Sequence, residues 1–235
     1  MARSLLLISL YTACLSYCDL SAAAEQLDTS GTVALGVDRV FGVVNYSESY
    51  NTPNSSGVGM DANTYHDTNW AILGRATAAF MYMQLQSPRL SADVIVVSGI
   101  SLGGGIVYDY DSGKSALPSG NGTDSHAGIW VLAPRIGFAK MLTKHVGLWP
   151  HAGITYMHYS EDYKFSDTNS VTTSTGDSAF LTLDANFVLS PISHTGLTIG
   201  PTLDLLIHRH NSPDSTSKDD RLTAIGVQAG LLIWI

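Results

Sequence analysis

The stretch TGLTIGPTLDLLIH, residues 195–208, alternates apolar and polar side chains along almost its whole length. Leu197 and Leu203 fall on one face of an extended chain, whereas Asp204 falls on the other. A period of two residues predicts a β-strand that is apolar on one face only. Leu206 is the residue that departs from the alternation.

The same alternation recurs elsewhere, and the sequence predicts eight strands in all. The other seven lie near residues 33–38, 89–97, 100–111, 127–141, 146–159, 178–189 and 222–235. Their connections differ in length: those at 98–99, 142–145 and 190–194 are short, and those at about 47–76, 112–126, 160–177 and 209–220 are long and polar. An even number of strands, with short turns at one end and long loops at the other, is typical of an outer-membrane barrel.

The placement of small residues decides between a membrane barrel and a soluble one. Glycines such as Gly103 and Gly200 fall on the polar face, and the bulky side chains fall on the apolar face. The interior of an eight-stranded barrel has room only for its own side chains, so the small and polar face belongs inside. We therefore predict an all-β fold, an eight-stranded antiparallel up-and-down transmembrane β-barrel. A soluble barrel or sandwich, with the apolar face inward, is the alternative.

The composition excludes several other classes of protein. Charged residues make up 14% of the chain, against about 25% in ordinary globular domains. A formal net charge of −8 leaves little to neutralise phosphates, so no nucleic-acid partner is expected. A helical membrane protein is excluded because the sequence has no run of about 18 apolar residues.

The N-terminal residues 1–24 are predicted to be a secretory signal peptide. Arg3 supplies the positive charge, Leu5 begins a short apolar run, and Ala22 to Ala24 offer a small-residue cleavage site. Residues 25–235 then form the barrel domain, which we expect in the outer membrane. Both cysteines of the chain belong to the predicted signal peptide, so the mature protein has no disulfide.

Four motifs give the chain a family resemblance. They are DRVFG at 38–42, LGGG at 102–105, APRIG at 133–137 and GLWPHAG at 147–153. With them the sequence resembles uncharacterised small outer-membrane β-barrel proteins of myxobacterium-like Gram-negative bacteria, and its layout is similar to the OmpA/OmpX-type eight-stranded barrels. The resemblance covers nearly the whole mature chain. It implies a fold and a location, and it implies no activity.

The C-terminus matches the strand pattern by which outer-membrane barrels are typically recognised by their assembly machinery. The pattern places a polar residue at Gln228, glycine at Gly230, and apolar residues at Ile233 and Ile235. The chain departs from it by ending in Ile235, where an aromatic residue is usual.

The predicted inward face collects the charged and polar groups that form the candidate site. These are Asp38, Arg89, Asp93, Arg135, His151, Asp184, Asp204 and Gln228. Four carboxylates and two guanidiniums sum to −4 + 2 = −2, and we predict an ion-pair network that plugs the barrel, because the planar guanidinium can hold two carboxylates at once. A polar conduction path is the alternative.

Arg39 breaks the alternation. Strict alternation points its side chain at lipid, where an arginine near the midplane costs about 2–4 kcal/mol. Either a β-bulge at Asp38 and Arg39 turns the side chain inward, or Arg39 lies near an interface and extends its charge to water.

The sequence contains no catalytic or metal-binding motif, so we expect no enzymatic activity and no cofactor. The candidate groups for catalysis are neighbouring Ser125 and His126, neighbouring Ser193 and His194, and His208. The expected role is structural, or a surface interaction through the extracellular loops. The expected partners are outer-membrane lipid and lipopolysaccharide and the assembly machinery, with the protein a monomer. An enzyme acting on envelope lipids and a narrow channel are the alternatives.

Aromatic residues gather near the ends of the predicted strands, among them Tyr108, Trp130 and Tyr156. In a membrane barrel such residues form girdles at the two lipid–water interfaces. In a soluble domain they would be core.

Overall fold

The computed structural model describes residues 27–52, 63–73, 87–116, 122–165, 171–212 and 221–235. The predicted signal peptide, residues 1–24, lies outside these ranges. Within them no helix is long and apolar enough to cross a membrane.

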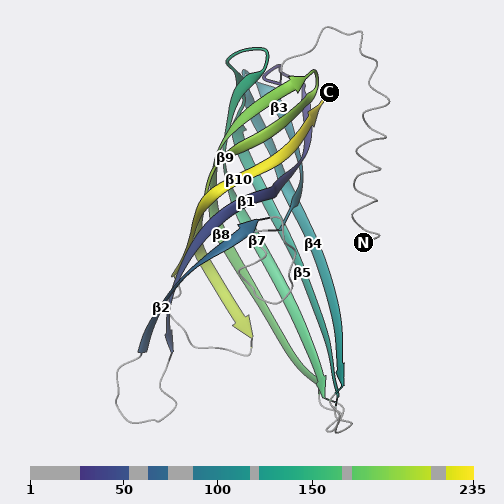
Figure 1. The fold of residues 1–235 in the computed structure, drawn as a ribbon, viewed down its shortest axis with the longest axis vertical. Helices are drawn as coiled ribbons and strands as arrows, with labels where there is room; N and C mark the ends of the chain where they lie inside the picture. Colours follow the sequence, from purple (N-terminus) through teal and green to yellow (C-terminus); the bar gives the residue numbers. More distant parts are fainter. Residues whose placement is uncertain (1–26, 53–62, 74–86, 117–121, 166–170, 213–220) are drawn as a thin grey trace.

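The described residues form one antiparallel sheet of ten strands (Figure 1). The strands are β1 (Val33–Thr52), β2 (Asn63–Leu73), β3 (Arg89–Val97), β4 (Ile100–Ala116), β5 (Gly122–Phe138), β6 (Lys140–Met141), β7 (Val146–Phe165), β8 (Val171–Ile192), β9 (Thr195–Ser212) and β10 (Arg221–Trp234).

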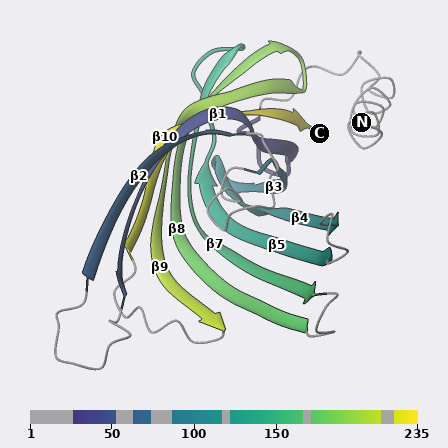
Figure 2. The same cartoon turned by 60° about the horizontal axis from the view of Figure 1, so that its bottom comes forward.

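Eight of these strands close into a ring. The pairing order runs β10-β9-β8-β7-β5-β4-β3-β1, and β10 pairs back with β1, so the ring has no free edge at this level (Figure 2). The closure lets each of the eight ring strands pair with a neighbour on both sides, as a barrel in lipid requires. The predicted eight-stranded antiparallel barrel is thereby confirmed.

The first long connection contains a strand that the sequence analysis did not predict. The first residues of β1, from Val33 to Asp38, pair with β3, and the residues from Gly42 to Thr52 pair with β2. β2 and β3 therefore occupy the same side of β1 at different heights. The prediction of a loop over residues 47–76 was wrong for β2 and for the end of β1.

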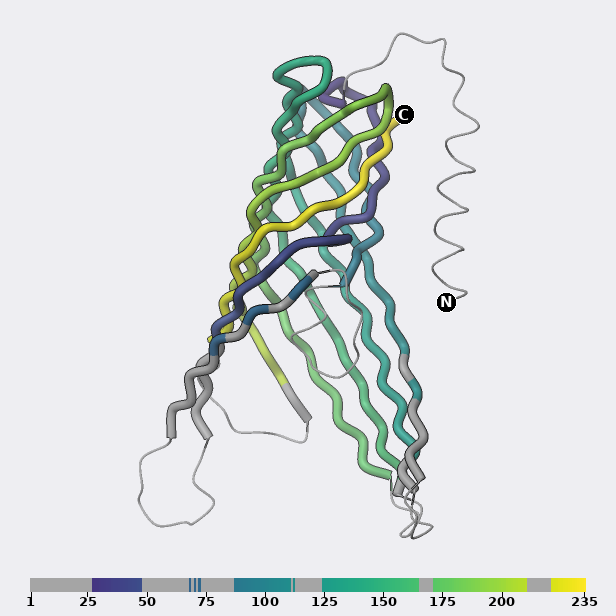
Figure 3. Tube along the Cα trace, in the orientation of Figure 1, coloured from purple at the N-terminus to yellow at the C-terminus, as the bar shows by residue number. Residues whose placement is uncertain are grey.

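The long connections at 112–126 and 160–177 are also largely strand. Ser112 lies opposite His126 in the β4–β5 ladder, and Ser160 lies opposite Thr175 in the β7–β8 ladder. β7 and β8 continue well past the closed ring, toward the end of the barrel opposite the C-terminus (Figure 3). The sequence did not reveal these extensions because alternation arises from one-sided contact with lipid, and water surrounds a strand that stands beyond the membrane.

The apolar face points outward and the polar face inward, as the distribution of glycines predicted. The outward side chains form a belt around the ring that includes Leu102, Ile136, Ile154, Phe187, Ile199 and Val227, all exposed. At the short-turn end, Ser98 and Gly99 both have positive φ, 45° and 85°. Such angles are those of a two-residue hairpin turn whose twist matches the strands it joins.

The interior is layered, which corrects the expectation of a polar lumen. At the short-turn end Leu27, Ile95, Trp149, Val188 and Trp234 belong to one buried apolar cluster. Toward the other end lies a second cluster, built from Val44, Ile129, Val131, Met157, Phe180, Leu222 and Ala224. The charged groups lie between the two clusters. Sequence reasoning missed the second one because strands there are apolar on both faces, as in Trp130-Val131-Leu132.

Candidate functional site

A bulge in β1 brings Arg39 into the barrel. The β1–β10 register shifts between Val37 and Phe41, so Asp38 and Arg39 both turn inward. Arg39 has a left-handed φ of 55° and a side chain that is 1% exposed. That backbone conformation costs about 1–2 kcal/mol for a residue with a Cβ. Of the two alternatives left open for Arg39, the bulge is therefore the observed one.

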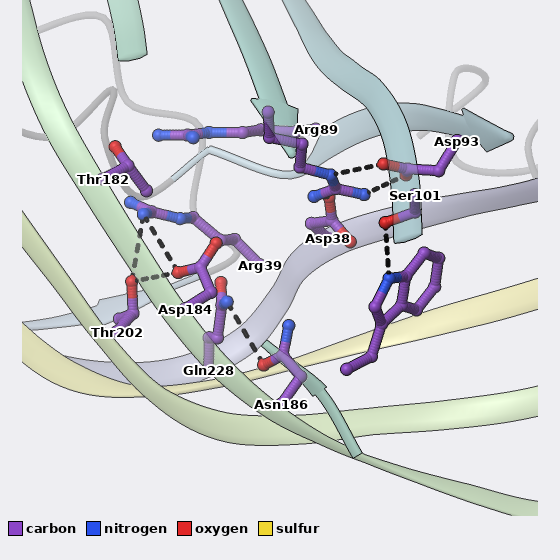
Figure 4. Close-up of polar contacts among 12 residues, drawn as sticks. Asp38, Arg39, Arg89, Asp93, Ser101, Thr182, Asp184, Asn186, Thr202 and Gln228 are labelled. Atoms are coloured by element: carbon purple, nitrogen blue, oxygen red, sulfur yellow. Dashed lines mark hydrogen bonds and ion pairs between the residues drawn. The ribbon is translucent and has the colours of Figure 1, made fainter. Parts of the chain in front are cut away.

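Arg39 contacts two acids on neighbouring strands, Asp184 and Asp204; Figure 4 shows its contacts with Asp184 and with the Thr202 hydroxyl. Its Nη2 donates to Oδ1 of Asp204 at 2.9 Å, and its Nη1 lies 2.8 Å from Oδ2 of the same carboxylate. Nη2 also donates to the Thr202 hydroxyl at 3.1 Å and lies 4.0 Å from Asp184. Thr202 in turn donates to Asp184 at 2.6 Å. Arg39 thus holds β1 against β8 and β9 across the interior.

Arg135 on β5 forms a second cluster with two other acids. Its Nε donates to Oδ1 of Asp93 at 3.0 Å and its Nη2 donates to Oδ2, a two-point contact on one carboxylate. Its Nη1 donates to Asp38. The guanidinium lies 6.0 Å from the centre of the Trp149 ring, and the indole N–H donates to Ser101 at 2.9 Å. Arg135 therefore connects β5 to β3 and β1.

Arg89 reaches the acids only through hydroxyl groups. Its Nη1 donates to Thr155 at 3.1 Å, the Thr155 and Thr182 hydroxyls are 2.8 Å apart, and Thr182 donates to Asp204 at 2.7 Å. Because the proton of Thr182 is used on Asp204, Thr155 must donate to Thr182. Within the described residues, Nε and Nη2 of Arg89 have no hydrogen-bond partner.

The charge of the layer follows from these three arginines. The Arg39 cluster and the Arg135 cluster each hold one guanidinium and two carboxylates, and each carries a local charge of −1. Arg89 adds one positive charge, so the layer sums to +3 − 4 = −1. The sequence estimate of −2 was too negative because it left Arg39 out. A buried charge is tolerated when it is paired and hydrogen-bonded, and both clusters meet that condition.

His151 and Gln228 lie in the same layer but outside the ion pairs. His151 is buried with its ring 4.6 Å from that of Trp149, and neither ring nitrogen has a hydrogen-bond partner in the described part of the chain. It borders a cavity of about 10 Å³, which is room for about one water molecule. Gln228 donates to Asn186 at 3.4 Å.

The groups that sequence reasoning missed are the hydroxyls of Thr155, Thr182 and Thr202 and the indole of Trp149. An inward-facing threonine looks the same in sequence whether it relays a hydrogen bond or merely fills space. Only the register shows that these three lie on adjacent strands, β7, β8 and β9.

The proposed C-terminal signal is split between the two faces. Gln228 and Gly230 are buried inside the barrel, whereas Ile235 is 65% exposed. Ile233 is half-buried. Recognition of these residues by an assembly machinery stays a prediction.

The serine–histidine neighbours named as catalytic candidates do not form pairs. Ser125 and His126 are consecutive on β5, so their side chains leave opposite faces of the strand; His126 lies 3.1 Å from the Tyr110 hydroxyl instead. Ser193 and His194 lie in the turn before β9, where His194 contacts the Trp234 carbonyl at 3.1 Å. In the described ranges no group of three histidine, cysteine or acidic residues could hold a metal ion.

No family model and no curated protein matches the sequence. Similar solved structures include Ail, the attachment invasion locus protein of Yersinia pestis, in complex with the heparin analogue sucrose octasulfate; it has 11% identity and a TM-score of 0.41, over 87% of this chain and 100% of that one. Neisserial surface protein A has 13% identity and a TM-score of 0.38, over 83% and 96%. AlkL, in lipid bilayers, has 10% identity and a TM-score of 0.43, over 93% and 96%.

Ring closure, the outward apolar belt and the inward charged layer are the features that define the molecule. Together they make this chain a small eight-stranded β-barrel with an apolar outer belt and a charged interior.

Proposed function

We propose that the protein resides in the outer membrane as a monomer with a plugged interior, and that its role is structural or a surface interaction through its extracellular end. The observation that carries the proposal is the closed charged layer. Arg39 and Arg135 each hold two carboxylates from other strands, and the layer draws on β1, β3, β5, β8 and β9. Such a network ties the walls of the barrel together and fills its centre.

The packing of side chains in the barrel interior argues against the alternative of a narrow channel. The cavity beside His151 has room for about one water molecule. A buried apolar cluster lies on either side of the charged layer. An ion crossing this interior would have to displace paired charges and packed apolar side chains in turn.

The length of the strands supports a role outside the membrane. β8 has 22 residues, about 55 Å at 3.3 Å per residue and a tilt near 40°, whereas the apolar band of such barrels is about 25 Å tall. Its far end is rich in Ser and Thr, and Thr173 there donates to Asp162 on β7 at 2.7 Å. In the same region Tyr163 donates to Glu161, and this hydrogen bond raises the pKa of the Tyr163 phenol.

The expected partners follow from these surfaces. The apolar belt faces outer-membrane lipid and lipopolysaccharide, and the C-terminal strand with Gln228, Gly230, Ile233 and Ile235 is offered to the assembly machinery. The extracellular strands present hydroxyl and carboxylate groups to whatever the protein meets outside the cell.

Single cysteines test the location and the orientation, because the barrel domain has none of its own. Thr173→Cys lies on the exposed extension of β8, and its matched control Lys144→Cys lies in an exposed turn at the opposite end. We expect the protein in outer-membrane fractions, with a gel mobility that changes on boiling. A membrane-impermeant maleimide should label Thr173→Cys on intact cells and Lys144→Cys only after the cells are opened. A soluble periplasmic protein without a heat-dependent shift would contradict the proposal.

A further inference from the structure

A row of polar and aromatic side chains crosses the outer face of the barrel. The strand register pairs its members one after another across β4, β5, β7, β8 and β9: Tyr108, Trp130, His158, Asp177 and His210. Asp177 stands 189 − 177 = 12 residues along β8 from Leu189 at the short-turn end, about 30 Å at 3.3 Å per residue and a 40° tilt. The row therefore lies just outside an apolar band about 25 Å tall, at the level of lipid headgroups.

His158 and Asp177 form a hydrogen-bonded pair within this row. Nδ1 of His158 lies 2.8 Å from Oδ1 of Asp177, and each side chain is 32% exposed. Tyr156 donates its hydroxyl to the same carboxylate oxygen. The Trp130 ring packs beside His158 and Tyr156, with its centre 5.7 Å from that of the His158 ring and 5.2 Å from that of the Tyr156 ring. Trp130 and Tyr156 therefore hold the pair in place.

This arrangement fixes which nitrogen of His158 is basic. Hydrogen bonds from Tyr156 and then His158 lower the pKa of Asp177, so its carboxylate stays charged at neutral pH. A charged carboxylate can only accept a hydrogen bond, so the proton of the neutral imidazole stays on Nδ1 and the lone pair is on Nε2. His158 contacts Asp177 through Nδ1, so Nε2 takes no part in that contact. Two further titratable groups face this carboxylate: Tyr156, and His210 opposite Asp177 on β9.

Ser160 supplies a hydroxyl on the same face. It lies two residues beyond His158 on β7, so the two Cα atoms are about 6.6 Å apart and the side chains project in parallel. Opposite Ser160 on β5 is Gly128. A Cβ added at Gly128 would meet only a Tyr110 ring carbon, at 3.8 Å. The glycine therefore leaves open the space that a side chain at this position would fill opposite the serine.

We propose that Ser160, His158 and Asp177 form a hydrolytic site for carboxylic esters of lipids in the outer leaflet. The inference goes beyond the proposed function and does not rest on the plugged interior, because all three side chains are on the outside of the barrel. Serine, histidine and a carboxylate are the parts of a nucleophilic site, and such sites are recognised by geometry rather than by sequence order. Here His158 contacts Asp177, and Ser160 lies two residues from His158 on the same face of β7. The position at the headgroup level brings the ester linkages of membrane lipids within reach.

The reaction balances with water as the only other reactant. Nε2 of His158 takes the proton of the Ser160 hydroxyl as Oγ bonds to the ester carbonyl carbon. The bond to the alcohol oxygen breaks, and His158 returns the proton to that oxygen, which leaves an acyl group on Ser160. Water then attacks the acyl carbon as Nε2 of His158 takes one of its protons, the bond between the acyl carbon and Oγ breaks, and His158 gives that proton to Oγ. The products are one carboxylic acid and one alcohol.

The test uses the mature full-length protein refolded in detergent and treated with a fluorophosphonate probe, which bonds covalently to an activated serine. We expect mass spectrometry to find the probe on Ser160. Labelling should be lost in Ser160→Ala and fall by about 10²-fold or more in His158→Ala, the usual contribution of a general base. Asp177→Asn should lower it as well and shift its pH profile, since the amide no longer fixes the Nδ1 proton. His126→Ala, another outward histidine, is the matched control and should label like the parent.

Folding is verified separately, because each variant must keep the heat-dependent gel shift. A folded parent that shows no adduct on Ser160, or a folded His158→Ala variant that labels as fast as the parent, would overturn the proposal. Release of fatty acid from vesicles of diacyl phosphatidylethanolamine or from purified lipopolysaccharide then identifies the source of the ester. If the parent protein releases fatty acid from neither substrate, the assignment to lipid esters is overturned.

Discussion

Replacing Arg135 by methionine tests whether the charged layer is held by specific pairs. The substitution keeps most of the side chain that packs near Trp149 but removes the guanidinium, which contacts Asp93 through two hydrogen bonds and Asp38 through a third. Asp93 is 1% exposed, so its charge cannot turn to water. Removing one partner of a buried pair costs about 3–5 kcal/mol, because the remaining charge is left without compensation. We expect Arg135→Met to lower the free energy of unfolding by this amount.

A second substitution in the Arg135→Met background distinguishes the loss of a specific ion pair from a change in the total charge of the layer. Asp93→Asn in the Arg135→Met background removes the stranded charge and should restore about half of the lost free energy, whereas Asp184→Asn should restore little, because Asp184 belongs to the Arg39 cluster. Urea unfolding in detergent, followed by tryptophan fluorescence, measures all four proteins. If Asp184→Asn rescues as well as Asp93→Asn, or if Arg135→Met is as stable as its parent, specific pairing is refuted.

Three further results are expected from the same unfolding assay. Arg39→Met should cost about 3–5 kcal/mol and be partly rescued by Asp204→Asn, which replaces its partner at 2.9 Å; no loss of stability in Arg39→Met, or no rescue by Asp204→Asn, would contradict the Arg39 cluster. Ser101→Ala leaves the buried indole N–H of Trp149 without its acceptor and should cost about 1–3 kcal/mol. Parental values of both tryptophan emission and stability would contradict this role of Ser101. Gly103→Ala would place a Cβ 2.2 Å from a backbone oxygen and should cost about 1–3 kcal/mol, whereas Gly105→Ala, whose nearest contact is 3.4 Å, is the matched control. Equal stability of the two glycine variants would refute the packing argument.

The ring of strands could be predicted from sequence because lipid and lumen impose opposite chemistry on alternate residues. That constraint acts only within the membrane. The outer part of β8 lies beyond it, and its Ser- and Thr-rich sequence reads as loop although it forms a ladder. β2 reads as loop because its first residues, Asn63 to Asn69, are mostly polar, although they pair with β1. Leu206 departs from the alternation for a different reason. The β8–β9 register shifts between Ala179 and Phe180, and the shift turns the Leu206 side chain to the inside.

Most of the charged members of the candidate site could be predicted from the sequence, but its threonine hydroxyls, the Trp149 indole and the pairing of its charges could not. Alternation alone places Asp93 and Arg135 inside, yet which acid meets which arginine depends on register and on the bulge at Arg39. The pair of His158 and Asp177 was missed for the same reason, because nothing in the sequence shows that residues on separate strands lie opposite each other.

Conductance of the wild-type protein in a planar lipid bilayer tests the central claim, a barrel closed by its own charged layer, most directly. We propose that the paired carboxylates of the Arg39 and Arg135 clusters, with packed apolar side chains on both sides, block the passage of ions. We predict no steady current from inserted protein whose heat-dependent gel shift proves that it is folded. A steady, ion-selective current from that same protein would contradict the plugged barrel.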